Sequence, residues 1–321
     1  MKLHLLFHDR CFDGLASAAL FSVFHRARHG EESPITLVGL SHGPEGGLGE
    51  GRLGPEENAV VDFAYLASER LTWWFDHHRT AFERPGDEEH FRADRSGQKF
   101  FDPTAPSCTG FIARMLGEHF GFDTSGHSEL IAAAERIDSA SFSSPREAVE
   151  LSSPACQLML WIERSERFED RVEVVRALGR GGVAEAVALP IVARHLGRYL
   201  EEHQQAAELI ASHCQRGSDV VFCDLSGFDL DAINKFVPYH LHPEAGYAVI
   251  LSRTGDTAKV SVGYNAWHAP EARRHDISAI CRAEGGGGHP YVGAITRRLE
   301  AVEDLRAIAY RIVEHLEGDG S

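Results

Sequence analysis

The sequence predicts a two-part α/β protein, on three observations. In the first half of the chain, short apolar runs alternate with segments of helical spacing, which is typical of a mostly parallel sheet with flanking helices. The middle of the chain repeats apolar residues at helical spacing, with an interruption near Pro190. The last third combines apolar strands with a closing helix, which predicts a smaller C-terminal α/β domain. We therefore expect domains at 1–185 and 217–321, joined by a helical connector at 186–216.

The individual elements follow from the same periodicity. Uninterrupted apolar runs predict strands, and apolar residues that recur every three or four positions predict helices. In the first half we expect strands at 3–7, 59–61 and 71–75, and helices at 15–27, 107–119 and 128–137. In the second half we expect strands at 220–225, 248–253 and 259–264, and a helix at 303–317. Ser107 precedes a helix and is expected to cap it, and Trp73 and Trp74 are expected in the core.

Composition and charge narrow the range of functions. The 321 residues are 43% apolar and 25% charged, and 32 basic against 48 acidic residues give a formal net charge of −16. A protein this acidic attracts a long polyanion weakly, so we expect no binding of long duplex DNA. No apolar run approaches the ~18 residues of a membrane span, and the apolar opening at 3–7 is too short for a signal peptide. We expect a cytoplasmic protein without a membrane partner.

The six cysteines, at positions 11, 108, 156, 214, 223 and 281, are scattered and form no C-x-x-C pair. This spacing favours neither a zinc ribbon nor a disulfide framework. We expect reduced thiols, and we expect Cys156, Cys214, Cys223 and Cys281 to be small buried residues.

Polar side chains that can bind metals follow three of the predicted strands. His8 and Asp13 follow the first, Asp62 follows the second, and Asp76-His77-His78 closes the third. In open α/β sheets, ligands bind outside the carboxyl ends of the strands. Mixed carboxylate and imidazole ligands suit Mn²⁺, Mg²⁺ or Zn²⁺, and a carboxylate that bridges two such ions would generate hydroxide for phosphoryl displacement.

Five segments resemble, in order, the motifs of the DHH phosphoesterase family, of the RecJ-like or nanoRNase-like kind. Trp73-Trp74-Phe75-Asp76-His77-His78-Arg79-Thr80-Ala81 is similar to its Asp-His-His segment. The other segments are His8-Asp9-Arg10-Cys11-Phe12-Asp13-Gly14, Val60-Val61-Asp62, Arg136-Ile137-Asp138-Ser139 and Gly285-Gly286-Gly287-Gly288-His289-Pro290. The last of these resembles the glycine-histidine motif of the DHH-associated C-terminal domain. Because the motifs span residues 8 to 290, the resemblance covers nearly the whole chain.

The resemblance implies two divalent ions, with Mn²⁺ expected and Mg²⁺ or Zn²⁺ as alternatives. Carried over residue by residue, the implied ligands are His8, Asp13, Asp62, His77 and Asp138. Asp62 is the implied bridge and a catalytic residue. Asp76 is a further implied catalytic residue and would orient His77. His78 would face the substrate and donate to the scissile phosphate or its leaving oxygen.

Cys11 departs from the family pattern. Most members have an aspartate at this position, and the spacing from His8 to Asp13 is one residue shorter here than in the family. A Cys11 thiolate would ligate a metal and favour a softer ion such as Zn²⁺. Alternatively, Cys11 is not a ligand, and Asp9 or water takes its place. Both alternatives are open at the level of sequence.

The glycine-histidine segment predicts substrate binding in the C-terminal domain. Consecutive glycines expose backbone N–H groups that can hold a phosphate, so we expect Gly286, Gly287, Gly288 and His289 to bind substrate. Many family members also have an arginine on the preceding strand, where this chain has Val262-Gly263-Tyr264-Asn265. Asn265 is expected to hydrogen-bond a phosphate without supplying charge. Arg273 and Arg274 either replace the missing charge or belong to the solvated surface.

These observations predict a metal-dependent phosphohydrolase that uses a metal-bridged hydroxide. The expected substrates are short oligonucleotides, linear dinucleotides or phosphoadenosine phosphate. Two other functions are open: a pyrophosphatase or polyphosphatase, and a regulatory protein that binds nucleotides but has lost turnover through the change at Cys11. The oligomeric state is also open, with a homodimer as one alternative.

Overall fold

The computed structural model of the chain describes residues 2–41, 47–230 and 233–318. These residues divide into two compact units. The first contains residues 1–142 and 152–200, and the second contains 143–151 and 201–321. Within the described part of the chain, no helix combines the length and the apolar character that a bilayer span requires.

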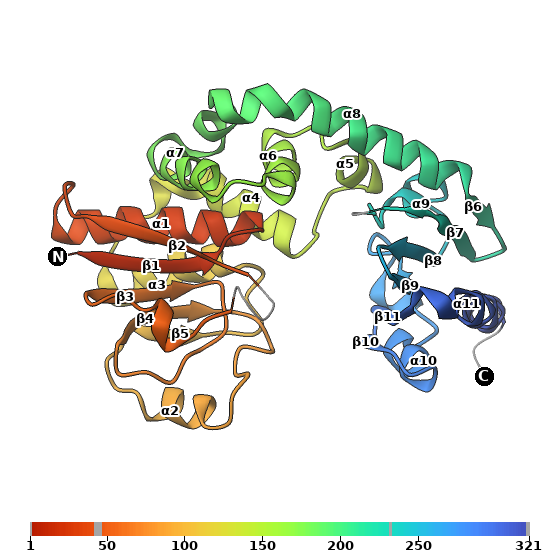
Figure 1. Cartoon of the computed structure of the whole chain (residues 1–321), viewed down its shortest axis with the longest axis horizontal. Coiled ribbons are helices and arrows are strands. Elements are labelled where there is room, and N and C mark those ends of the chain that lie inside the picture. The colour runs from red at the N-terminus through yellow and green to blue at the C-terminus, as the bar shows by residue number, and fades with distance from the viewer. Residues whose placement is uncertain (1, 42–46, 231–232, 319–321) are drawn as a thin grey trace. The chain divides into compact units, whose positions relative to one another are not determined.

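The first unit is built on a parallel five-stranded sheet (Figure 1). Its strands are β1 (Leu3–His8), β2 (Ile35–Leu40), β3 (Glu57–Val61), β4 (Leu71–Asp76) and β5 (Lys99–Phe101). Their order across the sheet is β2-β1-β3-β4-β5, and every neighbouring pair is parallel. The sequence predicts a mostly parallel sheet, and the sheet is parallel throughout, although β2 and β5 are absent from the predicted elements.

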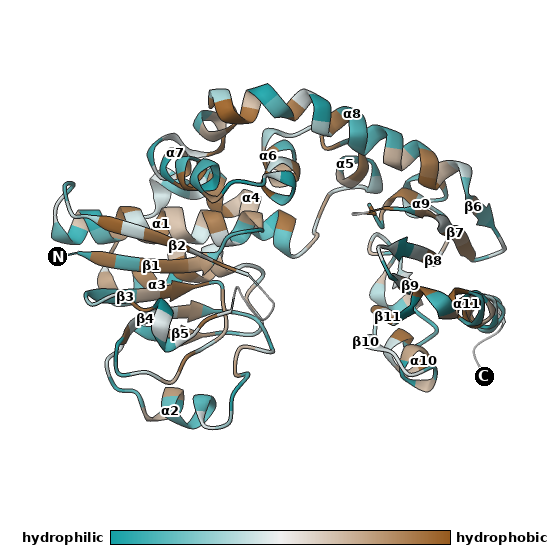
Figure 2. Cartoon of the chain, viewed as in Figure 1, coloured by the Kyte–Doolittle hydropathy of each residue, from teal (hydrophilic) through white to brown (hydrophobic). Residues whose placement is uncertain are grey.

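The helices of this unit are α1 (Phe12–His29), α2 (Asp87–Ala93), α3 (Cys108–Phe120), α4 (Ser128–Asp138), α6 (Pro154–Arg164) and α7 (Phe168–Val187). Helix α1 packs against strands β1 and β3 and against helices α3, α4 and α7. Residues on every side of its first half are buried, so α1 is a core helix. Figure 2 shows apolar residues concentrated on the sheet and on α1.

Two sequence predictions of local structure are confirmed in this unit. The Oγ of Ser107 accepts a hydrogen bond from the backbone N–H of Gly110 at 2.9 Å and so caps α3. Trp73 and Trp74 are buried in the core, with 2% and 0% of their surfaces exposed.

Helix α8 (Pro190–Ser212) begins where the sequence predicts an interruption of the helical segment. It belongs to the first unit as far as Leu200 and to the second from Glu201 onward. The short helix α5 (Pro145–Glu150) packs against α9 (Val237–Leu241) and belongs to the second unit.

The second unit contains a mixed six-stranded sheet with the order β10-β11-β9-β8-β7-β6. Its strands are β6 (Cys214–Arg216), β7 (Val220–Asp229), β8 (Tyr247–Thr254), β9 (Thr257–Tyr264), β10 (Gly287–His289) and β11 (Val292–Arg298). Helices α10 (Ile277–Ala283) and α11 (Val302–Glu317) pack against it. The fold is therefore α/β in both units, as the sequence predicts.

One cysteine prediction is wrong. Cys214 and Cys223 form a disulfide, with their Cα atoms 4.2 Å apart. The short strand β6 is not among the predicted elements, and its antiparallel pairing with β7 places Cys214 directly opposite Cys223. Cys108, Cys156 and Cys281 are buried, as expected for Cys156 and Cys281.

Candidate metal centre

The carboxyl ends of three parallel strands bring a set of donor side chains together. His8 closes β1, Asp62 follows β3, and Asp76-His77-His78 spans the end of β4. The first turn of α1 adds Asp13, and the last residue of α4 is Asp138. Because parallel strands end at one edge of the sheet, side chains far apart in the sequence meet there.

One group of donors surrounds the Nε2 atom of His77. This atom lies 3.3 Å from Oδ2 of Asp138, 3.7 Å from Oδ1 of Asp62 and 3.8 Å from Oδ2 of Asp13. Asp13, His77 and Asp138 offer ligand atoms that all lie within 4.8 Å of one another. This spacing is close enough for a single ion to contact all three after small side-chain adjustments.

A second group lies on the other side of Asp62. The Sγ of Cys11 donates to Oδ2 of Asp62 at 3.3 Å, and Nδ1 of His8 lies 3.9 Å from the same oxygen. His8, Cys11 and Asp62 also offer ligand atoms within 4.8 Å of one another. Asp62 thus directs Oδ1 toward His77 and Oδ2 toward His8 and Cys11, which is the arrangement that a ligand shared by two ions requires.

The backbone at Asp62 supports this placement. Asp62 adopts a φ of 54°, in the left-handed region that non-glycine residues rarely occupy. Its backbone N–H donates to the carbonyl of Phe75 at 3.0 Å, so pairing to β4 continues past the end of β3. A costly backbone conformation held by neighbouring contacts is common at functional sites.

Asp13 is fixed by the N-terminus of α3. Its carboxylate accepts hydrogen bonds from the backbone N–H groups of Cys108 at 2.6 Å and Thr109 at 3.0 Å. The Oγ1 of Thr109 donates a third, at 2.6 Å. A helix N-terminus favours a carboxylate at this position. Thr109 is missing from the predicted site residues, although it stands two positions after the predicted capping residue.

The Asp-His-His segment is oriented differently from the sequence interpretation. Oδ1 of Asp76 accepts from Nδ1 of His78 at 2.7 Å and from the backbone N–H of His77 at 2.8 Å. Asp76 therefore orients the ring of His78 and the backbone of His77. The ring of His77 is instead oriented through Nδ1, which donates to the carbonyl of Ala105 at 2.9 Å. That bond assigns the lone pair to Nε2, facing the carboxylates.

The pKa values of this group reflect how closely its acidic side chains are packed. Burial raises the pKa of Asp62 well above its usual value, and Asp13, Asp76 and Asp138 raise it further. Burial and Asp13 raise the pKa of Asp138 to about 6, although His77 and His78 oppose the shift. Burial, with Asp62 and Asp13, raises the pKa of the Cys11 thiol. Carboxylates packed this closely repel one another, and a divalent cation would relieve the repulsion.

Buried polar atoms without a hydrogen-bond partner test whether these residues fit a metal ion. Among the described residues, Oδ1 of Asp62, Oδ2 of Asp76 and Nε2 of His77 are buried without a hydrogen-bond partner. Buried polar atoms in folded proteins almost always have a partner, which can be an ion. Asp62 Oδ1 and His77 Nε2 lie 3.7 Å apart within one donor group. The residues present fit a divalent metal centre with carboxylate and imidazole ligands.

Asp9 lies beside this centre but has a different partner. Its Oδ2 accepts from Nη2 of Arg171 at 2.7 Å, and both side chains are buried. Arg171 also donates to the carbonyl of Ser165 at 2.8 Å. The carboxylate of Asp9 therefore anchors the end of β1 to α7. Arg171 is not among the predicted site residues, because no pattern in the sequence links it to a residue 162 positions away.

The glycine-histidine segment, residues 285–290, contains the whole of strand β10 (Gly287–His289), in the second unit. A side chain at Gly286 or Gly288 would collide with the backbone carbonyl of Ala294 or Val292, so part of the glycine requirement comes from the packing of β10 against β11. A Cβ at Gly287 would have no other atom within 4 Å, so the backbone at Gly287 has open space on that side. His289 is exposed, and its ring stacks on Tyr291 at a centroid distance of 5.7 Å.

Asn265 is placed in the interior of the second unit. It is 0% exposed, and its Nδ2 donates to the carbonyls of Ala245 at 2.8 Å and Pro243 at 3.1 Å. Its Oδ1 accepts from the backbone N–H of Trp267 at 3.1 Å. With all its polar atoms engaged internally, Asn265 supports a loop and presents no group to a ligand.

The two arginines considered for this region have internal partners. Nη1 of Arg273 donates to the carbonyl of His275 at 2.7 Å, and its guanidinium lies 4.8 Å from the ring centroid of Tyr291. Arg274 donates to Asp219 at 2.6 Å. Arg273 is therefore fixed beside the His289–Tyr291 stack, whereas Arg274 forms an ion pair elsewhere.

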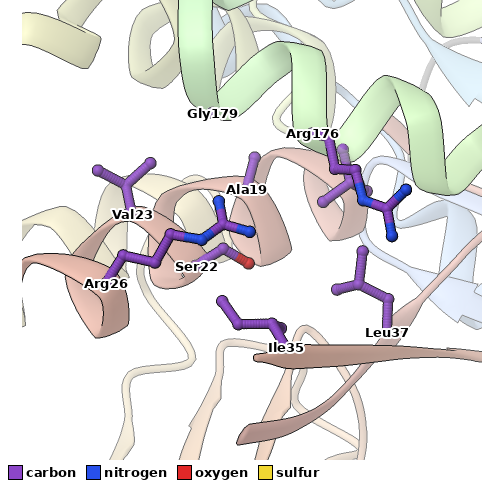
Figure 3. A pocket seen from close by; sticks show the side chains of 9 residues that line it. Ala19, Ser22, Val23, Arg26, Ile35, Leu37, Arg176 and Gly179 are labelled. Carbon is purple, nitrogen blue, oxygen red and sulfur yellow. The ribbon is translucent and has the colours of Figure 1, made fainter. Parts of the chain in front are cut away.

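A small pocket lies away from the metal centre, between α1, β2 and α7 (Figure 3). Arg26 and Arg176 extend into it from α1 and α7, beside Ser22, Ile35 and Leu37. It contains none of the residues that sequence analysis assigns to chemistry.

Comparison with known proteins gives structural neighbours. No protein-family model matches the sequence, and no curated protein is detectably similar to it. A solved structure of PggH from Vibrio cholerae, a pGpG-specific phosphodiesterase, has a TM-score of 0.69 and 20% identity, covering 98% of this chain and 99% of PggH.

Two structures of RecJ from Thermus thermophilus are also similar. The complex with Mn²⁺ has a TM-score of 0.55 and 13% identity, and the complex with Mg²⁺ has 0.50 and 14%. They cover 98% and 99% of this chain but only 52% and 50% of RecJ. The chain thus spans about half the length of RecJ, whereas it matches PggH from end to end. At these identities, the likeness establishes the fold.

Proposed function

We propose that this chain, whose fold is that of the DHH phosphoesterases, is a divalent-metal-dependent phosphoesterase that hydrolyses short nucleotidic phosphodiesters. The observation that carries the proposal is the orientation of the Asp62 carboxylate. Its two carboxylate oxygens face two separate groups of donors, centred on His77 and on His8 with Cys11.

The ligands of the two ions follow from this geometry. Asp13, His77 and Asp138 would hold one ion, His8 would hold the other, and Asp62 would contact both. Cys11 would join the second group if the bound ion is soft enough for a thiolate. We favour Mn²⁺, since the donors are carboxylates and imidazoles. When bound, such ions supply positive charge to phosphate oxygens and acidify water for attack at phosphorus.

The protein's own groups supply orientation and a proton. The side chain of His78 is 43% exposed, and its Nδ1 is held by Asp76. The hydrogen bond with Asp76 raises the pKa of His78. His78 would therefore hold a proton and donate it from Nε2 to the oxygen that leaves phosphorus. Asp13 and His77 stay in place because α3 and the carbonyl of Ala105 fix them.

The second unit would recognise the nucleotide. His289 and Tyr291 form an exposed stack of rings with an interplanar angle of 17°, and Arg273 packs against Tyr291. Aromatic rings with an adjacent arginine are typical of surfaces that stack on bases. The open backbone at Gly287 would approach a phosphate. A short substrate agrees with the net charge of −16, and a cytoplasmic location would agree with such a substrate.

The similarity in fold to PggH makes pGpG the first substrate to test. Purified protein with Mn²⁺ should add water to the internal phosphodiester of pGpG and release two mononucleotides. Pyrophosphate, phosphoadenosine phosphate and a long single strand of DNA are the comparison substrates. We expect faster hydrolysis of the dinucleotide than of pyrophosphate or the long strand.

Two other outcomes would indicate a different function. Faster hydrolysis of pyrophosphate would identify a pyrophosphatase. Tight binding of pGpG without turnover, combined with a gain of turnover in Cys11→Asp at equal metal content, would identify a regulatory nucleotide-binding protein.

A further inference from the structure

A second cluster of metal-binding side chains lies at the opposite edge of the first sheet. His25 and His29 are one turn apart near the C-terminus of α1, and Glu57 is the first residue of β3. Asp62 follows the last residue of that same strand. Five residues of extended chain span about 16 Å, so the two clusters are separate.

The three side chains converge. Residues four positions apart lie on the same face of a helix, and the rings of His25 and His29 have centroids 4.7 Å apart. Nε2 of His25 lies 3.3 Å from Oε2 of Glu57, and the three residues offer ligand atoms within 4.8 Å of one another. Ligand atoms around tetrahedral zinc lie about 3.3 Å apart, so a modest rotation of the half-buried His29 would complete the set.

His25 is buried, and one of its two ring nitrogens faces Glu57. Only 2% of its surface is exposed, and among the described residues its Nδ1 has no hydrogen-bond partner. The nitrogen that faces Glu57 is Nε2, so Nε2 is the atom that would ligate an ion, and Nδ1 would then carry the ring proton.

Glu57 is held in a position suited to a ligand. Its Oε1 accepts from Nε1 of Trp73 at 2.7 Å, which leaves Oε2 directed toward His25. A hydrogen-bonded neighbour that fixes a ligating carboxylate is characteristic of metal sites. Trp73 is buried, so this donor is itself fixed.

We propose that His25, His29 and Glu57 bind a zinc ion that connects the end of α1 to the start of β3. Two imidazoles and one carboxylate suit Zn²⁺ better than Mg²⁺ or Ca²⁺, which prefer all-oxygen sites. The ion would brace the amino-terminal edge of the sheet and would take no part in phosphoester hydrolysis.

The test measures bound Zn²⁺ in the full-length protein after equilibrium dialysis against excess Zn²⁺. The variants are His29→Ala and Glu57→Gln, which retain the buried His25. His119→Ala is the matched control, because His119 is an exposed histidine on α3 outside both clusters. We expect His29→Ala to bind one zinc fewer than the wild type and Glu57→Gln to bind that zinc at least tenfold more weakly. His119→Ala should retain the wild-type stoichiometry.

Hydrolysis of pGpG with Mn²⁺ separates this proposal from the proposed function. If the zinc is a brace, all three variants keep the wild-type rate within about twofold, whatever that rate is. Zn²⁺ should also raise the melting temperature of the wild type more than that of His29→Ala. Equal zinc content and equal thermal shifts in the wild type, His29→Ala and Glu57→Gln would overturn the proposal. Loss of one zinc in His119→Ala as well would also overturn it.

Discussion

The carboxylate of Asp62 lies between the two donor groups of the candidate metal centre. It is 1% exposed, and its two oxygens face different donor groups. Burial and three nearby carboxylates raise its pKa, so in the absence of metal it opposes folding at neutral pH. The same charge becomes favourable when divalent ions are bound.

We predict that Asp62→Asn lowers kcat on pGpG by at least about a hundredfold. An amide cannot supply two negatively charged oxygens, so metal content should fall as well. In EDTA, removal of the negative charge relieves the repulsion from Asp13, Asp76 and Asp138, and the melting temperature should stay equal or rise. Steady-state kinetics, metal analysis and thermal denaturation measure these effects. Wild-type turnover at unchanged metal content would remove Asp62 from the mechanism.

The lowered pKa of Glu57 makes the stability of the fold depend on pH. Burial alone would raise its pKa, but hydrogen bonds from His25 and Trp73 outweigh burial and leave the pKa below its usual value. A lowered carboxyl pKa stabilises the fold above the unfolded pKa of about 4.3, and this stabilisation is lost as the pH falls through the folded pKa.

In EDTA at pH 7, Glu57→Gln should therefore lower the free energy of unfolding by about 1–2 kcal/mol. The difference from the wild type should shrink as the pH falls below about 4.3 and passes through the lowered pKa of Glu57. Urea denaturation at a series of pH values from 7 downward provides the measurement. A difference that grows on acidification would contradict the assignment.

At the scale of elements, the buried ion pair between Asp9 and Arg171 joins β1 to α7. The side chains are 7% and 3% exposed, so neither charge is well solvated. Loss of one partner leaves the other charged and buried, which typically costs about 3–5 kcal/mol.

We predict that Arg171→Met lowers the free energy of unfolding by about 3 kcal/mol or more. The double variant Asp9→Leu with Arg171→Met should recover most of the loss, because no buried charge remains. Chemical denaturation of the wild type, both single variants and the double variant in EDTA measures the coupling. Additive losses in the double variant would mean that the pair is not the source of the effect.

At the scale of the whole molecule, the chemistry and the proposed nucleotide recognition belong to different compact units. The proposed metal ligands lie in the first unit, and Gly287, His289 and Tyr291 lie in the second. A small activated ester needs only the metal centre, whereas a dinucleotide also offers bases to the second unit.

His289→Ala should therefore raise KM for pGpG about tenfold or more, equivalent to the loss of one stacked base. Its kcat/KM on bis(p-nitrophenyl) phosphate and its metal content should stay near wild type. Kinetics on the two substrates, with Asp62→Asn as the variant that damages both, test this division. Equal losses on the two substrates would assign His289 to folding or chemistry.

The sequence alone predicts the parallel sheet and which side chains meet at its edge. Strands 3–7, 59–61 and 71–75 are buried apolar runs, and a parallel arrangement brings the residues that follow them to the same edge. His8, Asp62 and Asp76-His77-His78 accordingly lie together. The strands β2, β5, β6, β10 and β11 escape prediction. For β5, β6 and β10 the reason is length, because a three-residue strand has no measurable periodicity.

Contacts between residues distant in the sequence could not be predicted from the sequence and are known only from the tertiary structure. Thr109 holds Asp13 from 96 positions away, and the carbonyl of Ala105 orients His77 from 28 positions away. The pairing of β6 with β7 joins Cys214 to Cys223, and the packing of α1 over β3 brings His25 and His29 to Glu57. Periodicity reports which face of an element is buried. Which partner that face meets depends on how the elements pack.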